Sequence, residues 1–244
     1  MTNSFRRIRD ACLLGSAAAL LSLLTGLGPT ASQAETTEER VFAYQIKHPV
    51  FGDIGTYTNR VKTGDGKTEV STIVQVTVNV AGSLIFRQEA MRHERWEGER
   101  LVNFSSLTQT NEERLEVSGQ ARDGGFVVTS PSGTAMAPAT VRPTNPWSPS
   151  IASADMMFAP MSGRLFKPSI SAREETVRAA DGRNRKLRRY EIAGDKRQVV
   201  WFDESGVPLA FRSEENGMNI DFVLTSPDPA KLPARTEVPP LGLR

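Results

Sequence analysis

The sequence has few of the residues on which thiol and metal chemistry depend. Among 244 residues it contains one cysteine, Cys12, and two histidines, His48 and His93. Because Cys12 lies in the N-terminal segment, the rest of the chain can form no disulfide and offers no thiol nucleophile. A zinc site needs about three or four nitrogen, sulfur or oxygen ligands, and the two histidines are not paired at a ligand spacing. We therefore expect no metal site and no cofactor.

The chain also lacks a substantial net charge. It has 30 Lys and Arg against 28 Asp and Glu, and the resulting +2 comes entirely from Arg6, Arg7, Arg9 and Asp10. Residues 35–244 are formally neutral, so we expect no nucleic-acid partner. The basic run 183–189 has acidic residues close by, and we interpret it as a solvated hairpin. The alternative is an anionic partner of the cell envelope, such as lipid headgroups.

The first 34 residues have the pattern of a secretory signal peptide. Three arginines precede the apolar run 11–28, Pro29 follows it, and Ser32-Gln33-Ala34 places small residues before Glu35. We expect cleavage after Ala34 and a periplasmic or secreted protein. No later segment is long and apolar enough to span a bilayer, so we expect no membrane span in residues 35–244. The alternative for the first segment is an uncleaved anchor.

Residues 35–226 show the alternation of antiparallel β-strands. The clearest strand is 73–80, in which every second residue from Val74 onward is valine and the residues between them are polar. Hairpin turns are indicated at Gly64-Asp65-Gly66, Asp123-Gly124-Gly125 and Asn216-Gly217. Turn spacing of this kind predicts about ten or eleven strands.

The segment 131–168 is rich in proline and interrupts this pattern. We interpret it as a long crossover with at most one short helix, at Ile151–Phe158. Since amphipathic helices are almost absent, the sheet must cover its own apolar face by curling. The predicted fold is mainly β: one domain with a single curved antiparallel sheet or incomplete barrel, covered by this crossover. A tail with five prolines, 227–244, follows.

Three segments together resemble a proteobacterial family of exported proteins known only as a domain of unknown function. They are Phe51-Gly52-Asp53-Ile54-Gly55, the strand end and turn Glu94-Arg95-Trp96-Glu97-Gly98-Glu99-Arg100-Leu101, and Trp201-Phe202-Asp203-Glu204-Ser205-Gly206. The resemblance covers about residues 40–225. It implies a curved antiparallel sheet, loosely similar to periplasmic lipoprotein-carrier folds. It implies no catalytic residues.

A cluster of flexible apolar side chains in the crossover suggests a ligand site. Trp147 must bury its ring against an apolar surface, and the concave face of the sheet is the nearest one. Methionines next to it would suit varied apolar ligands, although the same residues could simply complete the core. The candidate ligand-binding residues are Trp147, Met156, Met157, Phe158, Trp96 and Trp201.

The leading functional hypothesis is an exported, non-catalytic envelope protein that binds or carries an apolar, lipid-like ligand in the concavity of the sheet. One alternative is an accessory of envelope assembly that recognises a protein partner, of unknown identity, through a sheet edge. A second alternative is a hydrolase, which would need carboxylates such as Asp53, Glu94 and Asp203 to converge. We expect Asp53 and Asp203 to serve turns, and both histidines to be structural or solvated.

Overall fold

A computed structural model describes residues 37–178 and 184–226 of the chain. The predicted signal peptide, residues 179–183 and the proline-rich tail lie outside the described residues. Within the described ranges the only helix is a single 3-10 turn, η1 (Pro149–Ser153), and antiparallel strands make up most of the structure. No helix in these ranges has the length and apolar character needed to cross a membrane.

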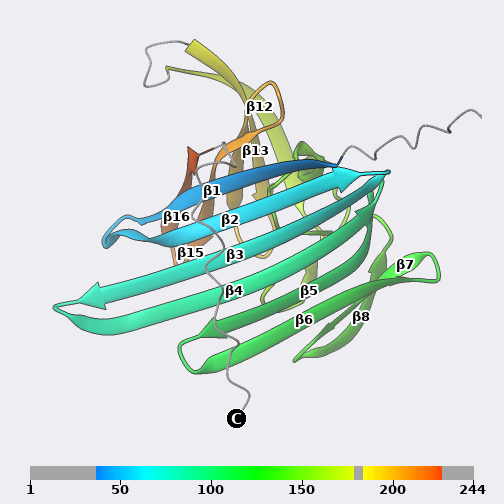
Figure 1. The fold of residues 1–244 in the computed structure, drawn as a ribbon, viewed down its shortest axis with the longest axis horizontal. Helices are drawn as coiled ribbons and strands as arrows, with labels where there is room; N and C mark the ends of the chain where they lie inside the picture. Colours follow the sequence, from blue (N-terminus) through cyan, green and yellow to red (C-terminus); the bar gives the residue numbers. More distant parts are fainter. Residues whose placement is uncertain (1–36, 179–183, 227–244) are drawn as a thin grey trace, which may run out of the picture. The chain divides into compact units, whose positions relative to one another are not determined.

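Thirteen strands form one large sheet. In chain order they are β1 (Glu38–His48), β2 (Gly52–Gly64), β3 (Lys67–Val80), β4 (Ser83–Glu97), β5 (Arg100–Thr110), β6 (Glu113–Arg122), β7 (Gly125–Ser130), β8 (Gly133–Pro138), β12 (Ser169–Arg178), β13 (Asn184–Ala193), β14 (Gln198–Phe202), β15 (Pro208–Glu215) and β16 (Met218–Ser226). All pairings are antiparallel, and the order across the sheet is β12-β13-β14-β15-β16-β1-β2-β3-β4-β5-β6-β7-β8 (Figure 1). The sheet therefore consists of two meanders, β1–β8 and β12–β16, which join where β16 pairs with β1.

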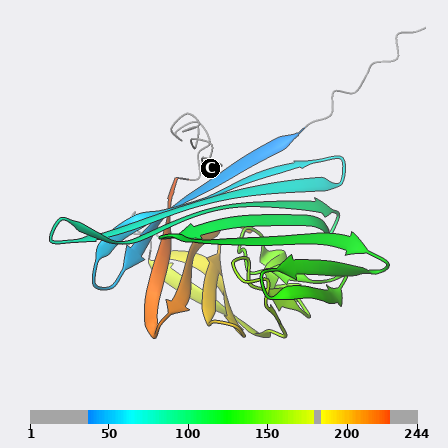
Figure 2. The same ribbon diagram turned by 90° about the horizontal axis from the view of Figure 1, so that it is seen from below.

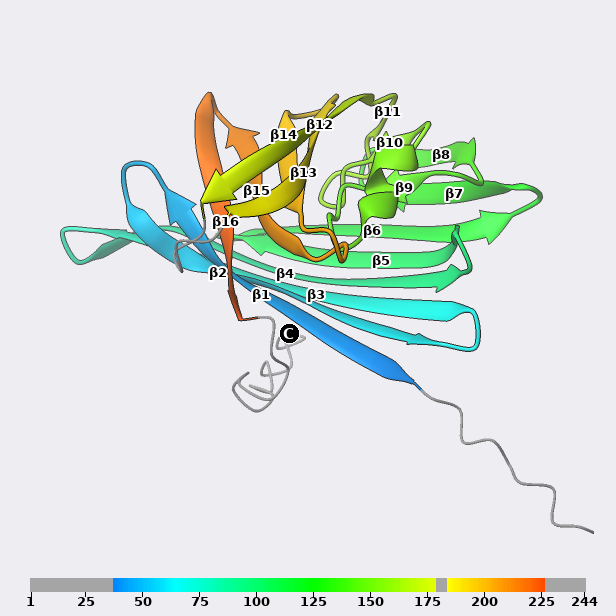
Figure 3. The same cartoon turned by 90° about the horizontal axis from the view of Figure 1, so that it is seen from above.

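The crossover between β8 and β12 forms a second, small sheet. It consists of β9 (Arg142–Pro143), β10 (Met157–Phe158) and β11 (Leu165–Phe166), with β10 in the centre. The large sheet curls so that β12–β16 on one side and β7–β8 on the other flank this small sheet and η1 (Figures 2 and 3). The large sheet is not closed into a barrel, since β12 and β8 remain its two edges.

Alternation along the strands explains which face is covered. In β3, Val70, Thr72, Val74, Val76 and Val78 are buried, while the residues between them are exposed or half-buried. The turns have the left-handed backbone expected of two-residue hairpins, for example φ of 51° at Asp65 and 69° at Gly66. The predicted fold class, a curved antiparallel sheet with a proline-rich crossover, is confirmed.

Three details of the prediction were wrong. The described residues contain sixteen strands rather than ten or eleven, and four of them lie in the predicted crossover: the edge strand β8 and the two-residue strands β9–β11. The crossover of the large sheet therefore begins after Pro138. The helix expected at Ile151–Phe158 is the shorter η1, which Ser148 caps with its side chain at Ser150 N, and Met157–Phe158 is extended as β10.

The core lies between the inner face of the large sheet and the crossover. Phe158 of β10 is fully buried and packs edge-on against Phe104 of β5, with ring centroids 4.8 Å apart. It also stacks on Phe126 of β7. The crossover thus completes the core of the curled sheet on the side of β4–β7.

Candidate functional site

The interior has a polar centre at Glu94, on the inner face of β4 near the C-terminal end of the strand. Glu94 is 2% exposed, and its two carboxylate oxygens accept three hydrogen bonds. Oε2 accepts from the indole N–H groups of Trp96 and Trp147, each at 3.0 Å, and Oε1 accepts from Asn145 Nδ2 at 2.7 Å. Two of these donors belong to the crossover, so Glu94 fixes the crossover to the sheet.

Asn145 is the hub of the same network. Its Nδ2 also donates to Thr72 Oγ1 at 3.1 Å, and its Oδ1 accepts from Tyr57 Oη at 2.8 Å and from Asn59 Nδ2 at 3.0 Å. Thr72 in turn donates to Asn59 Oδ1 at 2.7 Å. Every hydrogen-bonding position of the Asn145 amide is used, which is what a buried amide needs to be stable.

Burial sets the protonation of two groups in this network. Burial raises the pKa of Glu94 above its ordinary value of 4.5, although the hydrogen bonds from Asn145, Trp147 and Trp96 oppose the shift. Burial also raises the pKa of Tyr57 to about 12. The Tyr57 hydroxyl therefore remains protonated and donates to Asn145.

The space around Trp96 and Trp147 is filled. The two indoles pack edge-on with centroids 5.9 Å apart, and the Arg142 guanidinium lies 5.0 Å from the Trp96 ring. The void beside them has a volume of only about 10 Å³. This part of the interior cannot hold a ligand without rearrangement.

A larger cavity, of about 340 Å³, lies elsewhere in the interior. On the sheet side its wall is aromatic: Tyr57, Phe211 and Phe222 contact one another, and the last two stack with centroids 4.1 Å apart. On the other side the crossover supplies Pro146, Ala159, Pro160, Met161 and Phe166. The volume is at the lower end of the range of about 300–1,000 Å³ typical of small-molecule sites.

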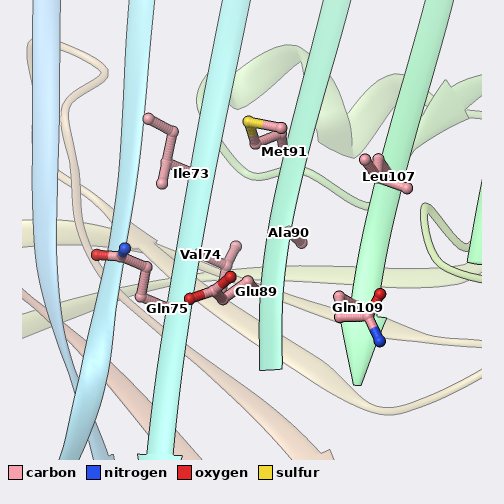
Figure 4. A pocket seen from close by; sticks show the side chains of 8 residues that line it. All are labelled: Ile73, Val74, Gln75, Glu89, Ala90, Met91, Leu107 and Gln109. Atoms are coloured by element: carbon pink, nitrogen blue, oxygen red, sulfur yellow. The ribbon is translucent and has the colours of Figure 1, made fainter. Parts of the chain in front are cut away.

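Two other hollows suit an apolar ligand less well. One of about 280 Å³ has a charged lining that includes Glu174, Lys186, Arg188 and Glu204. The other lies on the outer face of β3, β4 and β5, where Figure 4 shows side chains such as those of Met91 and Leu107 over the flat strands. Its volume is only about 20 Å³, which is enough for a water molecule and no more.

The six predicted ligand residues all lie in the described part of the chain, and none of them lines the 340 Å³ cavity. Met157, Phe158 and Trp96 are packed in the core at 0%, 0% and 3% exposure, while Met156 is half-buried against it. Trp147 is held by Glu94. For these five residues the packing favours the alternative that they complete the core.

Trp201 is separate from the other five. It lies on the outer face of β14, where its indole N–H donates to Glu175 Oε2 at 3.0 Å. Its hollow, of about 80 Å³, includes Arg189, Arg197 and Arg212. These three arginines pair with the three carboxylates of Glu175, Glu191 and Asp221, so this surface carries no excess of positive charge.

The acidic residues and histidines considered as catalysts are dispersed. Asp53 is exposed and pairs with Lys47 at 3.0 Å, and Asp203 accepts from the backbone N–H groups of Ser205 and Val207 within its turn. His48 Nδ1 accepts from two backbone N–H groups of its own turn, and exposed His93 contacts Ser71. No group of three or more potential metal ligands occurs among the described residues.

The cavity residues that the sequence analysis did not select fall into two groups. Pro160, Met161 and Phe166 follow Met156 and Met157 within the same proline-rich segment. Tyr57, Phe211 and Phe222 are aromatic residues on the inner faces of β2, β15 and β16. Their meeting at one wall depends on the pairing of β16 with β1, which no local pattern indicates.

Comparison with known proteins gives the family. Residues 52–225 match the model described as Domain of unknown function (DUF6134). The chain belongs to this family. The predicted resemblance to a β-rich family of unknown function is thereby confirmed. No curated protein matches the sequence.

One solved structure supports the fold of this family member. It is described as a beta-barrel-like protein of domain of unknown function DUF1849 from Brucella abortus. The TM-score is 0.57 at 9% sequence identity, and the match covers 77% of this chain and 95% of that one. At this identity the similarity shows the fold alone.

Proposed function

We propose that the protein is an exported, non-catalytic binding protein that holds an apolar, lipid-like ligand between the curled sheet and its crossover. The observation that supports this proposal is the 340 Å³ cavity with its wall of Tyr57, Phe211 and Phe222. Residues of this kind bind apolar molecules by removing their surface from water. The signal-peptide pattern of residues 1–34 is the basis for placing this activity in the periplasm or outside the cell.

The arrangement of acidic residues supports binding rather than hydrolysis. Glycosidase-type chemistry needs two carboxyl groups within about 5–10 Å of each other. Gly55, two residues after Asp53, pairs with Val76, whereas Glu94 pairs with Val70, so Asp53 and Glu94 are more than about 20 Å apart along the strands. Both oxygens of Glu94 are occupied by the crossover.

Solvent extraction tests the proposal directly. The protein is purified without detergent, extracted with chloroform and methanol, and the extract is analysed by mass spectrometry. We expect a lipid-like compound in amounts comparable to the protein. An empty extract, together with no binding of an apolar fluorescent dye by the extracted protein, would contradict the proposal.

A pair of substitutions locates the compound. Ala159→Phe adds a ring at the wall of the cavity and should lower recovery of the compound several-fold. Ile73→Phe adds a comparable ring on the outer face of β3, where Ile73 is 41% exposed, and should leave recovery unchanged. Equal recovery from both variants would place the compound outside the cavity.

A further inference from the structure

Arg92 gives the wall of the cavity a charge that the fold itself does not neutralise. Arg92 lies on the inner face of β4, between Thr72 of β3 and Ser106 of β5, and lines the cavity. Its Nε is buried and finds no hydrogen-bond acceptor among the described residues. The side chain as a whole is half-buried, but an N–H group that has lost water without gaining an acceptor is costly.

The other charged residues that line the cavity are paired. Lys196 forms an ion pair with Glu215, and Asp195 forms one with Arg164. Glu94, two residues from Arg92, acts on it only at longer range, since the Glu94 oxygens accept from Asn145, Trp96 and Trp147. In the described part of the chain, Arg92 has no carboxylate at ion-pair distance.

Unpartnered polar atoms surround the same position. The buried hydroxyls of Ser106, opposite Arg92, and Thr108, opposite Ala90, have no hydrogen-bond partner among the described residues, and the same holds for the buried Gln198 Oε1. Most buried polar atoms in folded proteins are hydrogen-bonded. Of these three residues only Gln198 lines the cavity together with Arg92, while Ser106 and Thr108 lie next to Arg92 on β5. A ligand in the cavity would supply the partner that Arg92 Nε lacks, whereas the Glu94 network needs none.

We propose that the ligand of this cavity is a single-chain amphiphile whose anionic headgroup, a carboxylate or a phosphate, binds Arg92. This inference rests on the proposed function and adds the chemical class of the ligand. The aromatic wall and Met161 would cover the chain, and the guanidinium would donate to the headgroup. The volume of about 340 Å³ fits one chain better than a lipid with two.

A displacement assay separates the headgroup from the chain. An apolar fluorescent dye is bound to the solvent-extracted protein and displaced by dodecanoate, dodecyl phosphate, dodecanol or inorganic phosphate. We expect at least one of the two anionic amphiphiles to bind about tenfold or more tightly than dodecanol, which corresponds to about 1.4 kcal/mol. Their order distinguishes a fatty acid from a phosphate headgroup.

Three variants test the role of Arg92. Arg92→Met replaces the guanidinium with an apolar side chain of similar length. It should abolish the preference for the anionic amphiphiles without weakening the binding of dodecanol. Arg92→Lys keeps the charge and should retain part of the preference. The control Arg95→Met removes an arginine from the outer face of the same strand, where the side chain is 60% exposed, and should change nothing.

The outcomes separate this inference from the proposed function. Equal binding of dodecanol and both anions by the native protein, or an unchanged preference in a folded Arg92→Met variant, would overturn the headgroup assignment while leaving apolar binding intact. Binding of inorganic phosphate at Arg92 without binding of any dodecyl compound would overturn both the amphiphile and the proposed function.

The melting temperature of each variant confirms that it is folded. If Arg92→Met does not fold, loss of the preference in Arg92→Gln supports the assignment and its retention overturns it.

Discussion

Glu94 and Arg92 are two residues apart on the inner face of one strand, and their surroundings differ completely. Glu94 is enclosed by donors from the sheet and the crossover, and the space beside its tryptophans is closed. Arg92 faces a cavity of about 340 Å³ and has a buried Nε without a partner. The fold completes the hydrogen bonding of one residue and leaves the other incomplete.

This difference distinguishes an interior residue that stabilises the fold from one that is available to bind a ligand. A closed polar network fixes the crossover in one position and contributes to stability through many coupled hydrogen bonds. An open wall with an unpaired charge does not stabilise the free protein, and is expected where something else binds. Substitutions on the two sides should therefore act on different measurements.

The largest effect is expected from Glu94→Ala. It leaves the Trp96, Trp147 and Asn145 donors buried without an acceptor, and each such donor costs about 1–3 kcal/mol. We expect the free energy of unfolding to fall by about 3 kcal/mol or more, measured by denaturant titration. The control Glu69→Ala, on the outer face with a side chain 65% exposed, should change it by less than about 0.5 kcal/mol. Similar losses in both would mean that the network does not stabilise the fold.

Trp147→Phe should have a smaller effect. It keeps an aromatic ring at the crossover but removes one indole N–H from Glu94, at an expected cost of about 1–2 kcal/mol. Trp201→Phe removes the same kind of hydrogen bond, to Glu175, from the outer face. There water can replace the donor, so we expect a loss of about 0.5 kcal/mol or less. A larger loss from Trp201→Phe would reverse this ranking.

Arg92→Met should leave the stability of the ligand-free protein within about 1 kcal/mol of the native value. Arg92 is half-buried, and its substitution removes a buried Nε–H that has no acceptor, so any change should be upward. Thermal unfolding of solvent-extracted samples measures this. A loss of several kcal/mol would show that Arg92 has structural partners and would remove the contrast with Glu94.

The pH dependence should separate Glu94 from the exposed acids. Because burial raises the pKa of Glu94 in the folded state, the fold binds its proton more tightly than the unfolded chain does. Its contribution to stability is present below about pH 4.5 and is lost as the pH rises through the raised pKa. Glu175 has a lowered pKa, chiefly because of the hydrogen bond from Trp201, and acts in the opposite sense, losing its contribution as the pH falls.

Glu94→Gln isolates the Glu94 contribution. Gln cannot ionise, so above pH 4.5 the stability of this variant should decline less with rising pH than that of the native protein. Denaturant titration from pH 4 to pH 8 measures the two slopes. Parallel curves would contradict a raised pKa at Glu94.

The sequence predicts the local parts of this structure well and the long-range parts poorly. Alternation and turn residues identify most hairpins, because each depends on residues close in the chain. Strand β8, with the sequence Gly-Thr-Ala-Met-Ala-Pro between prolines, has little β-propensity and forms because β7 offers it a pairing edge. The two-residue strands β9–β11 are too short to show any alternation.

The same limit applies to the site. Ala90, Arg92, Glu94 and Trp96 alternate with other residues along one strand, so they share a face, and the apolar Ala90 and Trp96 indicate that this face points inward. The hydrogen-bond partners of Glu94 could not be predicted from the sequence. Asn145 is 51 residues from Glu94 in the chain, and only the folded crossover brings them to 2.7 Å.

The most direct test of cavity binding is a methyl NMR titration. Protein labelled at the methionine and isoleucine methyl groups is titrated with dodecanoate, and the peaks are assigned by substitution. We predict shifts at Met161 and Ile192, which line the cavity, and little change at Met157 in the closed core or at Met136, which is 61% exposed. Shifts confined to Met136 and other exposed methyl groups, or no shifts at all, would contradict ligand binding in the cavity.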